Sequence, residues 1–124
     1  DCGLAPLGVA HGDFLMQSGA MAMANLIHTV PEADGLFAGS DLMAAGALRV
    51  LMASGRTVPQ DVAVVGFDDT VVAATSAPPL TSINQPLRDM GVRAAELALQ
   101  ALREGVTEPR QVVLPTTLTL RESV

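Results

Sequence analysis

Two aspartates stand side by side at the end of a strongly apolar segment. The run VAVVGF (62–67) has the composition of a buried β-strand, and Asp68 and Asp69 follow it directly. Such a pair could cap a helix, accept hydrogen bonds from polyol hydroxyls at roughly 1.5–3 kcal/mol each, or serve a metal or acid–base site. Both histidines lie far from the pair in sequence, and no zinc, calcium-loop, Walker, GxGxxG or GxSxG spacing is present. These absences count against an enzyme.

Three further residues could contact a ligand. Ser40 directly precedes an apolar periodic segment, so it is either a helix N-cap or a ligand contact. Asp13 has the position of an N-cap for the segment that follows it. Phe14 is either part of the core or an aromatic surface for the apolar face of a sugar or a base.

The composition excludes several classes of partner. The formal net charge is −6, and the seven basic residues are scattered arginines, so the chain lacks the basic patch that DNA phosphates require. Trp and Tyr are absent, which disfavours a stacking surface for single strands. Apolar runs end well before the roughly 20 residues of a membrane span, and no signal peptide is visible. The single cysteine, Cys2, has no disulfide or metal-binding partner. We expect no metal, no cofactor and no membrane contact.

Strand-like and helix-like segments alternate along the chain. Alternation at this spacing predicts an α/β fold with a mostly parallel sheet. The strand at 62–67 is apolar on both faces, which predicts helices on both sides of the sheet. Ligands of such sheets bind at the carboxyl ends of the strands, where Asp13, Ser40 and Asp68 are expected. Strands are predicted at 6–10, 34–39 and 62–67, helices at 14–29, 40–55 and 86–105, a short helix at 70–75, an extended segment at 76–86, and one or two strands within 110–123.

Three motifs occur together and in order, namely SDLMAAGAL (40–48), VPQDVAVVGFDD (58–69) and PPLTSINQP (78–86). In this combination the chain resembles the LacI/GalR family of bacterial transcription regulators. The resemblance implies a periplasmic-binding-protein-like fold of two α/β subdomains with a ligand cleft between them, of which this chain is a fragment without the N-terminal helix-turn-helix headpiece. It assigns 1–84 to most of the C-terminal subdomain, 85–114 to a return segment of the N-terminal subdomain, and 115–124 to the final crossover and strand of the C-terminal subdomain. The helix of 86–104 would then lack its sheet, so its apolar face would need another partner.

The resemblance also implies roles for individual residues. Asp68 would accept ligand hydroxyls, Phe14 would form an aromatic wall, and Asp69 would cap the next helix. Ser40 stands where the family often has Asn. The implied effector contacts are Asp13, Phe14, Ser40, Asp68 and Gln85.

The partners that the resemblance implies are a small-molecule effector, a sugar or polyol, and a second copy in a homodimer. The family's dimer contacts fall on 42–53 and 71–80. Operator DNA would be bound only through the missing headpiece, in the cytoplasm. The implied mechanism is a population shift in which no bond is made or broken.

Two other functions stay open from the sequence. A periplasmic sugar-binding protein of an ABC transporter has the same fold, and a signal peptide upstream would favour it. A small α/β enzyme could use Asp68 and Asp69 as metal ligands or as acid and base.

Overall fold

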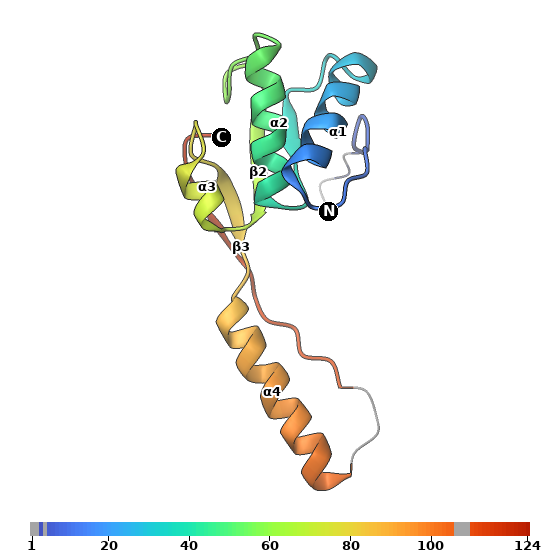
Figure 1. Ribbon diagram of the computed structural model, residues 1–124, viewed down its shortest axis with the longest axis vertical. Coiled ribbons are helices and arrows are strands. Elements are labelled where there is room, and N and C mark those ends of the chain that lie inside the picture. The colour runs from blue at the N-terminus through green and yellow to red at the C-terminus, as the bar shows by residue number, and fades with distance from the viewer. Residues whose placement is uncertain (1–2, 4, 106–109) are drawn as a thin grey trace. The chain divides into compact units, whose positions relative to one another are not determined.

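A computed structural model describes residues 3, 5–105 and 110–124 of the chain (Figure 1). Helices and strands alternate as the sequence predicts. Two compact units result, one of Asp1–Asn84 with Leu118–Val124 and one of Gln85–Thr117. The assignment of these units to subdomains of a larger protein stays a prediction. The elements are α1 (Met16–Thr29), β1 (Gly35–Phe37), α2 (Asp41–Ala53), β2 (Ala63–Asp68), α3 (Val71–Thr75), β3 (Thr81–Asn84), α4 (Leu87–Glu104) and β4 (Thr117–Thr119).

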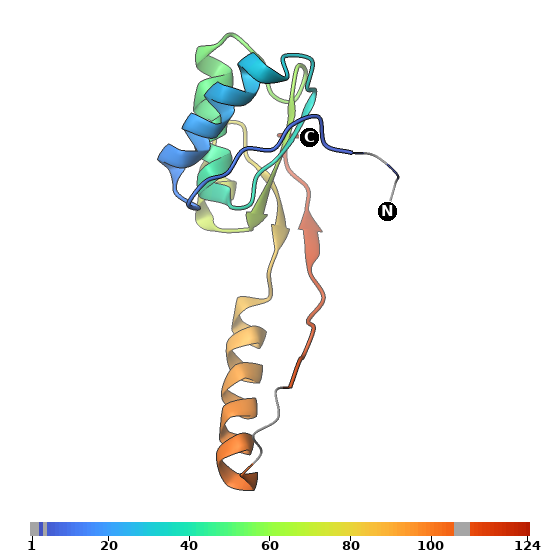
Figure 2. The same ribbon diagram turned by 90° about the vertical axis from the view of Figure 1, so that its right-hand side faces the viewer.

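The sheet has the order β1-β2-β3-β4. β1 and β3 both run parallel to β2, with Leu36 paired to Val64 and Gly66 paired to Ser82. β4 lies beside β3 and points the opposite way (Figure 2). The carboxyl ends of β1, β2 and β3 therefore meet at one edge of the sheet, which confirms the mostly parallel arrangement predicted from the alternation.

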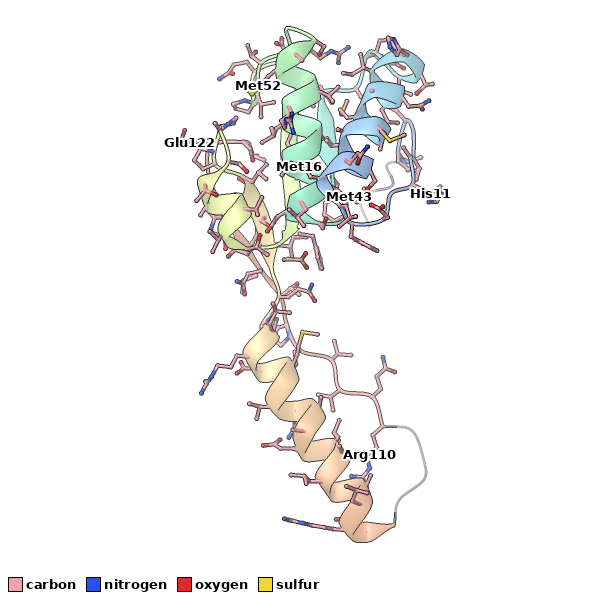
Figure 3. The ribbon with its side chains drawn as sticks, in the orientation of Figure 1. His11, Met16, Met43, Met52, Arg110 and Glu122 are labelled. Carbon is pink, nitrogen blue, oxygen red and sulfur yellow. The ribbon has the colours of Figure 1, made fainter. Side chains whose placement is uncertain are left out.

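The first two helices pack against each other at close range. A Cβ placed on Gly19 of α1 would overlap the backbone of Met43, and one placed on Gly46 of α2 would overlap the carbonyl of Met16. Met16 and Met43, both labelled in Figure 3, thus lie on the facing sides of the two helices. The small residues of these helices serve this contact within the chain, because only glycine leaves room for backbones this close.

The core lies between α2 and the strands β2 and β3. Leu51, Val64 and Leu80 are among its fully buried side chains. Along β2 the burial alternates, with Val64 and Gly66 buried and the residues between them half-buried. In Figure 2, α1 and α2 lie to one side of the sheet. The expected helical cover is therefore present on one face, and the opposite face of β2 is only half-buried among the described residues.

One predicted strand is absent. Residues 6–10 have no strand pairing in the described part of the chain. A strand needs a neighbour to hydrogen-bond with, and the sheet ends at β1. The strand prediction at 6–10 is therefore wrong for this chain on its own.

The second unit consists of α4 and an extended return. Gly105 is the C-cap of α4, and its φ of 63° is the left-handed conformation expected at that position. No residue of α4 is buried, and Leu102 is 81% exposed. The apolar face predicted for this helix is thus present and lacks full cover within its own unit. Among the described residues, no helix is both long and apolar enough to cross a membrane.

Candidate functional site

The loop before α1 holds Phe14 in an unusual backbone conformation. Its φ is 67°, in the left-handed region that costs a non-glycine residue roughly 1–2 kcal/mol. The Ser40 hydroxyl donates a hydrogen bond to the Phe14 carbonyl at 3.1 Å and so joins this loop to the loop after β1. The Phe14 side chain is 65% exposed. Phe14 is therefore not a core residue, and a strained, exposed aromatic side chain is typical of a binding surface.

Asp13 does not cap α1, which corrects the prediction from the sequence. The N-cap is Leu15, because the left-handed Phe14 delays the start of the helix. The Asp13 carboxylate instead accepts a hydrogen bond from the Leu15 N–H at 3.0 Å. Hydrogen bonding from Ser18, and then from Leu15, lowers the pKa of Asp13 below its ordinary value. Asp13 is thus an exposed, ionised carboxylate beside Phe14.

Ser40 is the N-cap of α2, as the sequence predicts. Its hydroxyl oxygen accepts from the Met43 N–H at 3.2 Å, and its hydrogen goes to Phe14. The residue is 5% exposed. Two internal hydrogen bonds therefore occupy this hydroxyl, and both of them fix the geometry of the adjoining loops.

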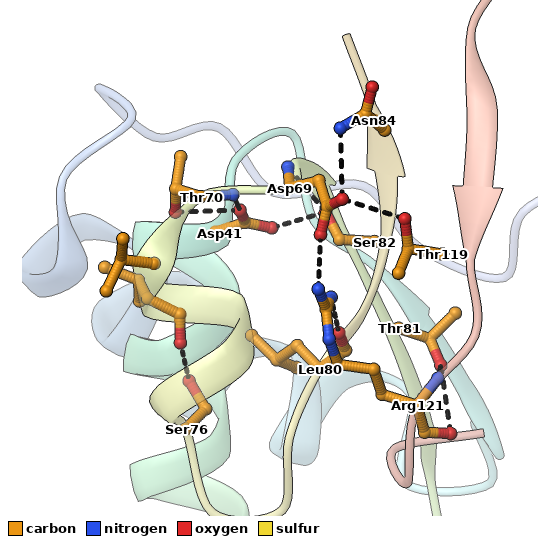
Figure 4. Close-up of polar contacts among 12 residues, drawn as sticks. Asp41, Asp69, Thr70, Ser76, Leu80, Thr81, Ser82, Asn84, Thr119 and Arg121 are labelled. Atoms are coloured by element: carbon orange, nitrogen blue, oxygen red, sulfur yellow. Dashed lines mark hydrogen bonds and ion pairs between the residues drawn. The ribbon is translucent and has the colours of Figure 1, made fainter.

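Asp68 is the last residue of β2 and lies in register with Asn84 of β3. Its φ is 102°, and the φ of Asp69 is 53°. Two consecutive aspartates with positive φ persist only where the surrounding structure holds them in place. Two carboxylates hold this turn in place through the hydrogen bonds that they accept. One belongs to Asp41 and the other to Asp69 itself (Figure 4).

The Asp41 carboxylate holds the loop after β2 from the side of α2. It accepts hydrogen bonds from the Thr70 N–H at 2.6 Å, from the Thr70 hydroxyl at 2.9 Å, and from the Ser82 hydroxyl at 2.6 Å. Asp41 is 1% exposed. A Cβ on Gly66 would overlap this carboxylate, so the glycine of the strand leaves room for it. Three charge-assisted hydrogen bonds thereby tie α2, the loop after β2 and β3 together.

The Asp69 carboxylate holds the same loop from the other side (Figure 4). It forms an ion pair with Arg121 at 2.7 Å and accepts hydrogen bonds from Asn84 at 3.1 Å and from Thr119 at 2.8 Å. The Asp69 N–H donates to the Ser82 hydroxyl at 3.1 Å. Asp69 therefore joins the loop that carries Asp68 to the end of β3 and to β4.

Asp69 is not the cap of α3, which corrects the role implied by the resemblance. The N-cap of α3 is Thr70, without a side-chain cap bond, and the Asp69 carboxylate points to Arg121 and β4 instead. Burial by itself raises the pKa of Asp69. Hydrogen bonds from Thr119, Arg121 and Asn84, with the Arg121 charge, outweigh burial and lower the pKa below its ordinary value. Asp69 is thus a structural anion neutralised by Arg121.

The structure brings some of the predicted residues together and leaves one apart. Asp13, Phe14, Ser40 and Asp68 belong to one unit, and each lies in a loop or strand end at the carboxyl edge of the sheet. Gln85 is the first residue of the other unit, where its carbonyl accepts a hydrogen bond from the Leu87 N–H at 2.8 Å. The role of Gln85 as an effector contact stays a prediction.

No group of three or more metal-ligating side chains occurs within residues 3, 5–105 and 110–124. Asp69 is committed to Arg121, so the pair Asp68 and Asp69 does not offer two available carboxylates to one cation. The arrangement suits recognition by hydrogen bonds: an aromatic surface at Phe14 and carboxylates at Asp13 and Asp68.

Sequence reasoning missed the residues that hold the site. Asp41 is not among the residues singled out from the sequence, yet it is buried and bonded to Thr70 and Ser82. Arg121 lies 52 positions after Asp69, too far along the chain for a local motif to link them. The polar residues that follow each strand were the sequence signal that could have indicated such a network, since a buried polar group needs a hydrogen-bond partner.

Residues 5–124 match the family described as periplasmic binding protein-like domain. Over 115 residues the chain is 51% identical to the HTH-type transcriptional regulator CelR of Thermobifida fusca, covering 93% of this chain and 34% of that protein. The chain thus spans about a third of the length of the curated relatives that it matches.

Solved structures agree. A transcriptional regulator CelR–cellobiose complex superposes with a TM-score of 0.87 at 51% identity, over 91% of this chain and 35% of that one. A LacI family transcriptional regulator from Arthrobacter sp. FB24, in complex with lactose, gives a TM-score of 0.77 at 38% identity, over 88% of this chain and 41% of that one.

The alternating elements, the parallel sheet with its polar carboxyl edge, and these matches converge on one assignment. The chain belongs to the periplasmic-binding-protein-like domain family and is part of the core of a LacI/GalR-type transcription regulator.

Proposed function

We propose that this chain is the effector-binding part of a sugar-responsive transcription regulator. The observation that carries the proposal is the carboxyl edge of the sheet, where a network of partly buried hydrogen bonds holds the loops in which Phe14 and Asp68 have left-handed backbone conformations. The relatives add the ligand class, because the similar regulators include complexes with cellobiose and with lactose.

In this proposal each residue does what its geometry allows. Asp68 accepts hydrogen bonds from two sugar hydroxyls, and Asp13 accepts from another. Phe14 stacks on the apolar face of the sugar ring, as its 65% exposure permits. Ser40 lines the site and acts mainly by fixing the Phe14 loop through the 3.1 Å hydrogen bond. Gln85, which belongs to the other unit, is a further contact to the effector.

The signal is a change in the population of two arrangements of the units. An effector that binds one arrangement more tightly shifts the equilibrium toward it, by no more than its difference in affinity for the two. In a homodimer this shift alters how two headpieces, outside these 124 residues, meet operator DNA in the cytoplasm. The chain is not an enzyme in this mechanism, because no bond is made or broken.

Ligand titration tests the proposal. The full-length natural protein that contains this chain is titrated calorimetrically with cellobiose, lactose and ribose. We expect one sugar to bind, and Asp68→Asn to weaken that binding about 10- to 100-fold, because a charge-assisted hydrogen bond is worth roughly 1.5–3 kcal/mol. Asp34→Asn makes the same chemical change at an exposed site and should bind like the wild type. Equal binding by Asp68→Asn would remove Asp68 from the site, and no binding of any sugar would refute the ligand class.

Sequencing the coding DNA upstream of residue 1 distinguishes the regulator from the alternative, a periplasmic sugar-binding protein of a transporter. A helix-turn-helix followed by further α/β sequence supports the regulator. A secretion signal without a helix-turn-helix would make the same residues part of a transport protein.

A further inference from the structure

Two stretches of chain connect the two units, and one carboxylate binds both of them. The first unit runs to Asn84 and resumes at Leu118, so the chain leaves this unit after β3 and returns to it in β4. The Asn84 side-chain amide donates a hydrogen bond to Asp69 Oδ2 at 3.1 Å, and the Thr119 hydroxyl donates to the same oxygen at 2.8 Å (Figure 4). The outgoing and the returning strand are therefore bonded to a single atom at the boundary of the unit.

The remaining groups of Asp69 are bonded deeper in the first unit. The other carboxylate oxygen, Oδ1, is paired with the Arg121 guanidinium at 2.7 Å. The Asp69 N–H donates to the Ser82 hydroxyl at 3.1 Å, and this hydroxyl donates to the buried Asp41 carboxylate at 2.6 Å. Backbone and side chain of Asp69 thus both have partners in the first unit, so the position of Oδ2 is set by that unit.

Asp69 directly follows the proposed effector contact Asp68. The φ values of Asp68 and Asp69 are 102° and 53°, and few backbone conformations with positive φ are open to a residue that has a Cβ. The peptide plane that joins the two residues is rigid, so a rotation of the backbone at Asp68 also reorients Asp69. A ligand that binds the Asp68 carboxylate therefore acts on a turn whose next side chain is bonded to both connections.

Holding the sheet together does not by itself explain the bonds to Asn84 and Thr119. β3 and the C-terminal segment are already joined inside the unit, where the Thr81 N–H donates to the buried Ser123 hydroxyl at 2.8 Å. The bonds from Asn84 and Thr119 add a fixed point at the boundary. Hinge motions are absorbed by a few residues at the ends of elements, and such a fixed point determines which residues these are.

We propose that Asp69 is the positioning residue that transmits effector binding at Asp68 to both connections between the units. This inference rests on the proposed function, because it takes Asp68 as an effector contact. By holding Asn84 and Thr119, the Asp69 carboxylate confines bending to residues 85–86 on the way out and 115–118 on the way back. An effector that favours one shape of the 68–69 turn then favours one setting of both connections, and this difference between two arrangements is what coupling requires.

Thr119→Val tests the inference, because it removes one of the two bonds and leaves the proposed effector contacts unaltered. Valine keeps the β-branched shape of a strand residue, and the ion pair between Asp69 and Arg121 remains. The full-length natural protein is titrated calorimetrically with cellobiose, lactose and ribose. Amide hydrogen exchange is then measured at residues 116–118 with and without the sugar that binds. These residues include no proposed effector contact, so a response there is transmitted.

The wild type and three variants should give distinct responses. In the wild type we expect the sugar to slow exchange at residues 116–118 at least about tenfold, within the roughly 5- to 150-fold range of coupling between sites. Thr119→Val should bind the sugar within about threefold of the wild type, yet its exchange response should fall to about twofold or less, because a hydrogen bond to a charged group is worth about tenfold or more in an equilibrium. Thr119→Ser keeps the hydroxyl and should retain the response. Thr117→Val makes the same chemical change at an exposed residue of β4 and should respond like the wild type.

The outcomes separate the inference from the proposed function. Sugar binding with an unchanged response in Thr119→Val overturns the inference alone, as does sugar binding to the wild type without a response at residues 116–118. Loss of sugar binding in Thr119→Val also overturns it, because Thr119 would then act on the binding site and not on transmission. If no sugar binds the wild type, the titrations refute the proposed function, and the inference falls with it.

Discussion

Replacing Asp69 by Asn tests whether one carboxylate holds the loop of the proposed site. The substitution keeps the shape of the side chain and removes its charge. Asp69 and Arg121 are 11% and 21% exposed, and their nearest atoms are 2.7 Å apart. The variant therefore leaves a mostly buried guanidinium without its counter-charge, which typically costs about 3 kcal/mol. It also weakens the hydrogen bonds from Asn84 and Thr119.

The measurement is urea and thermal unfolding of both proteins at pH 7. With an unfolding entropy of about 2 cal/mol/K per residue, a loss of about 3 kcal/mol lowers Tm by roughly 10 °C. Asp34→Asn is the matched control, since that carboxyl is exposed and in the same unit, and it should change Tm little. Identical unfolding midpoints for wild type and Asp69→Asn would refute the proposed anchoring.

The pH dependence gives an independent check. The pKa of Asp69 is lowered in the folded protein, so its ionised form contributes stability fully above the unfolded value of about 3.9. That contribution is lost as the pH falls through the folded pKa. We expect the stability gap between wild type and Asp69→Asn to be constant from about pH 5 to 7 and to narrow below about pH 4. A gap that persists unchanged in strong acid would mean that the charge is not its cause.

Three further tests follow from close contacts and backbone conformation, and the variants of each are measured by urea unfolding. Gly46→Ala should destabilise by about 1–3 kcal/mol through overlap with α1, whereas Gly91→Ala, with open space around it in α4, should stabilise by about 0.5–1 kcal/mol; equal signs would contradict the packing argument. Ser123→Ala should cost about 1–3 kcal/mol, because the buried Thr81 N–H loses its acceptor at 2.8 Å, and a neutral result would show that another acceptor replaces it. Phe14→Gly should be about 1 kcal/mol more stable than Phe14→Ala, because φ is 67°, and the reverse order would exclude strain there.

Secondary structure was predictable where local periodicity and local stops agree. The segment 86–105 has an amphipathic repeat, Pro86 at its start and Gly105 at its end, and α4 occupies Leu87–Glu104. Ser40 capped α2 as predicted because an N-cap bond spans only three residues. Signals of this kind act within one turn, so the sequence displays them directly.

Predictions failed where the deciding partner is distant or missing. Asp13 and Asp69 both had the local sequence context of helix caps. The left-handed Phe14 moves the start of α1 to Leu15 as its N-cap, and the Asp69 carboxylate pairs with Arg121 instead of capping α3. Residues 6–10 had a strand-like sequence, but a strand forms only beside another strand. Local propensity is a weak prior that such contacts override.

The sequence by itself determined the order of elements, the parallel sheet and the family, because apolar periodicity and short motifs are properties of neighbouring residues. Only the tertiary structure decided which polar side chains face a ligand and which hold the loops. Folding brings together side chains that lie up to 80 positions apart in the sequence, namely Asp41, Ser82, Asp69 and Arg121. Because these side chains are largely shielded from water, each forms a hydrogen bond or an ion pair within the chain. Residues that far apart become partners through chain folding, and the choice among possible partners is made by distance and burial.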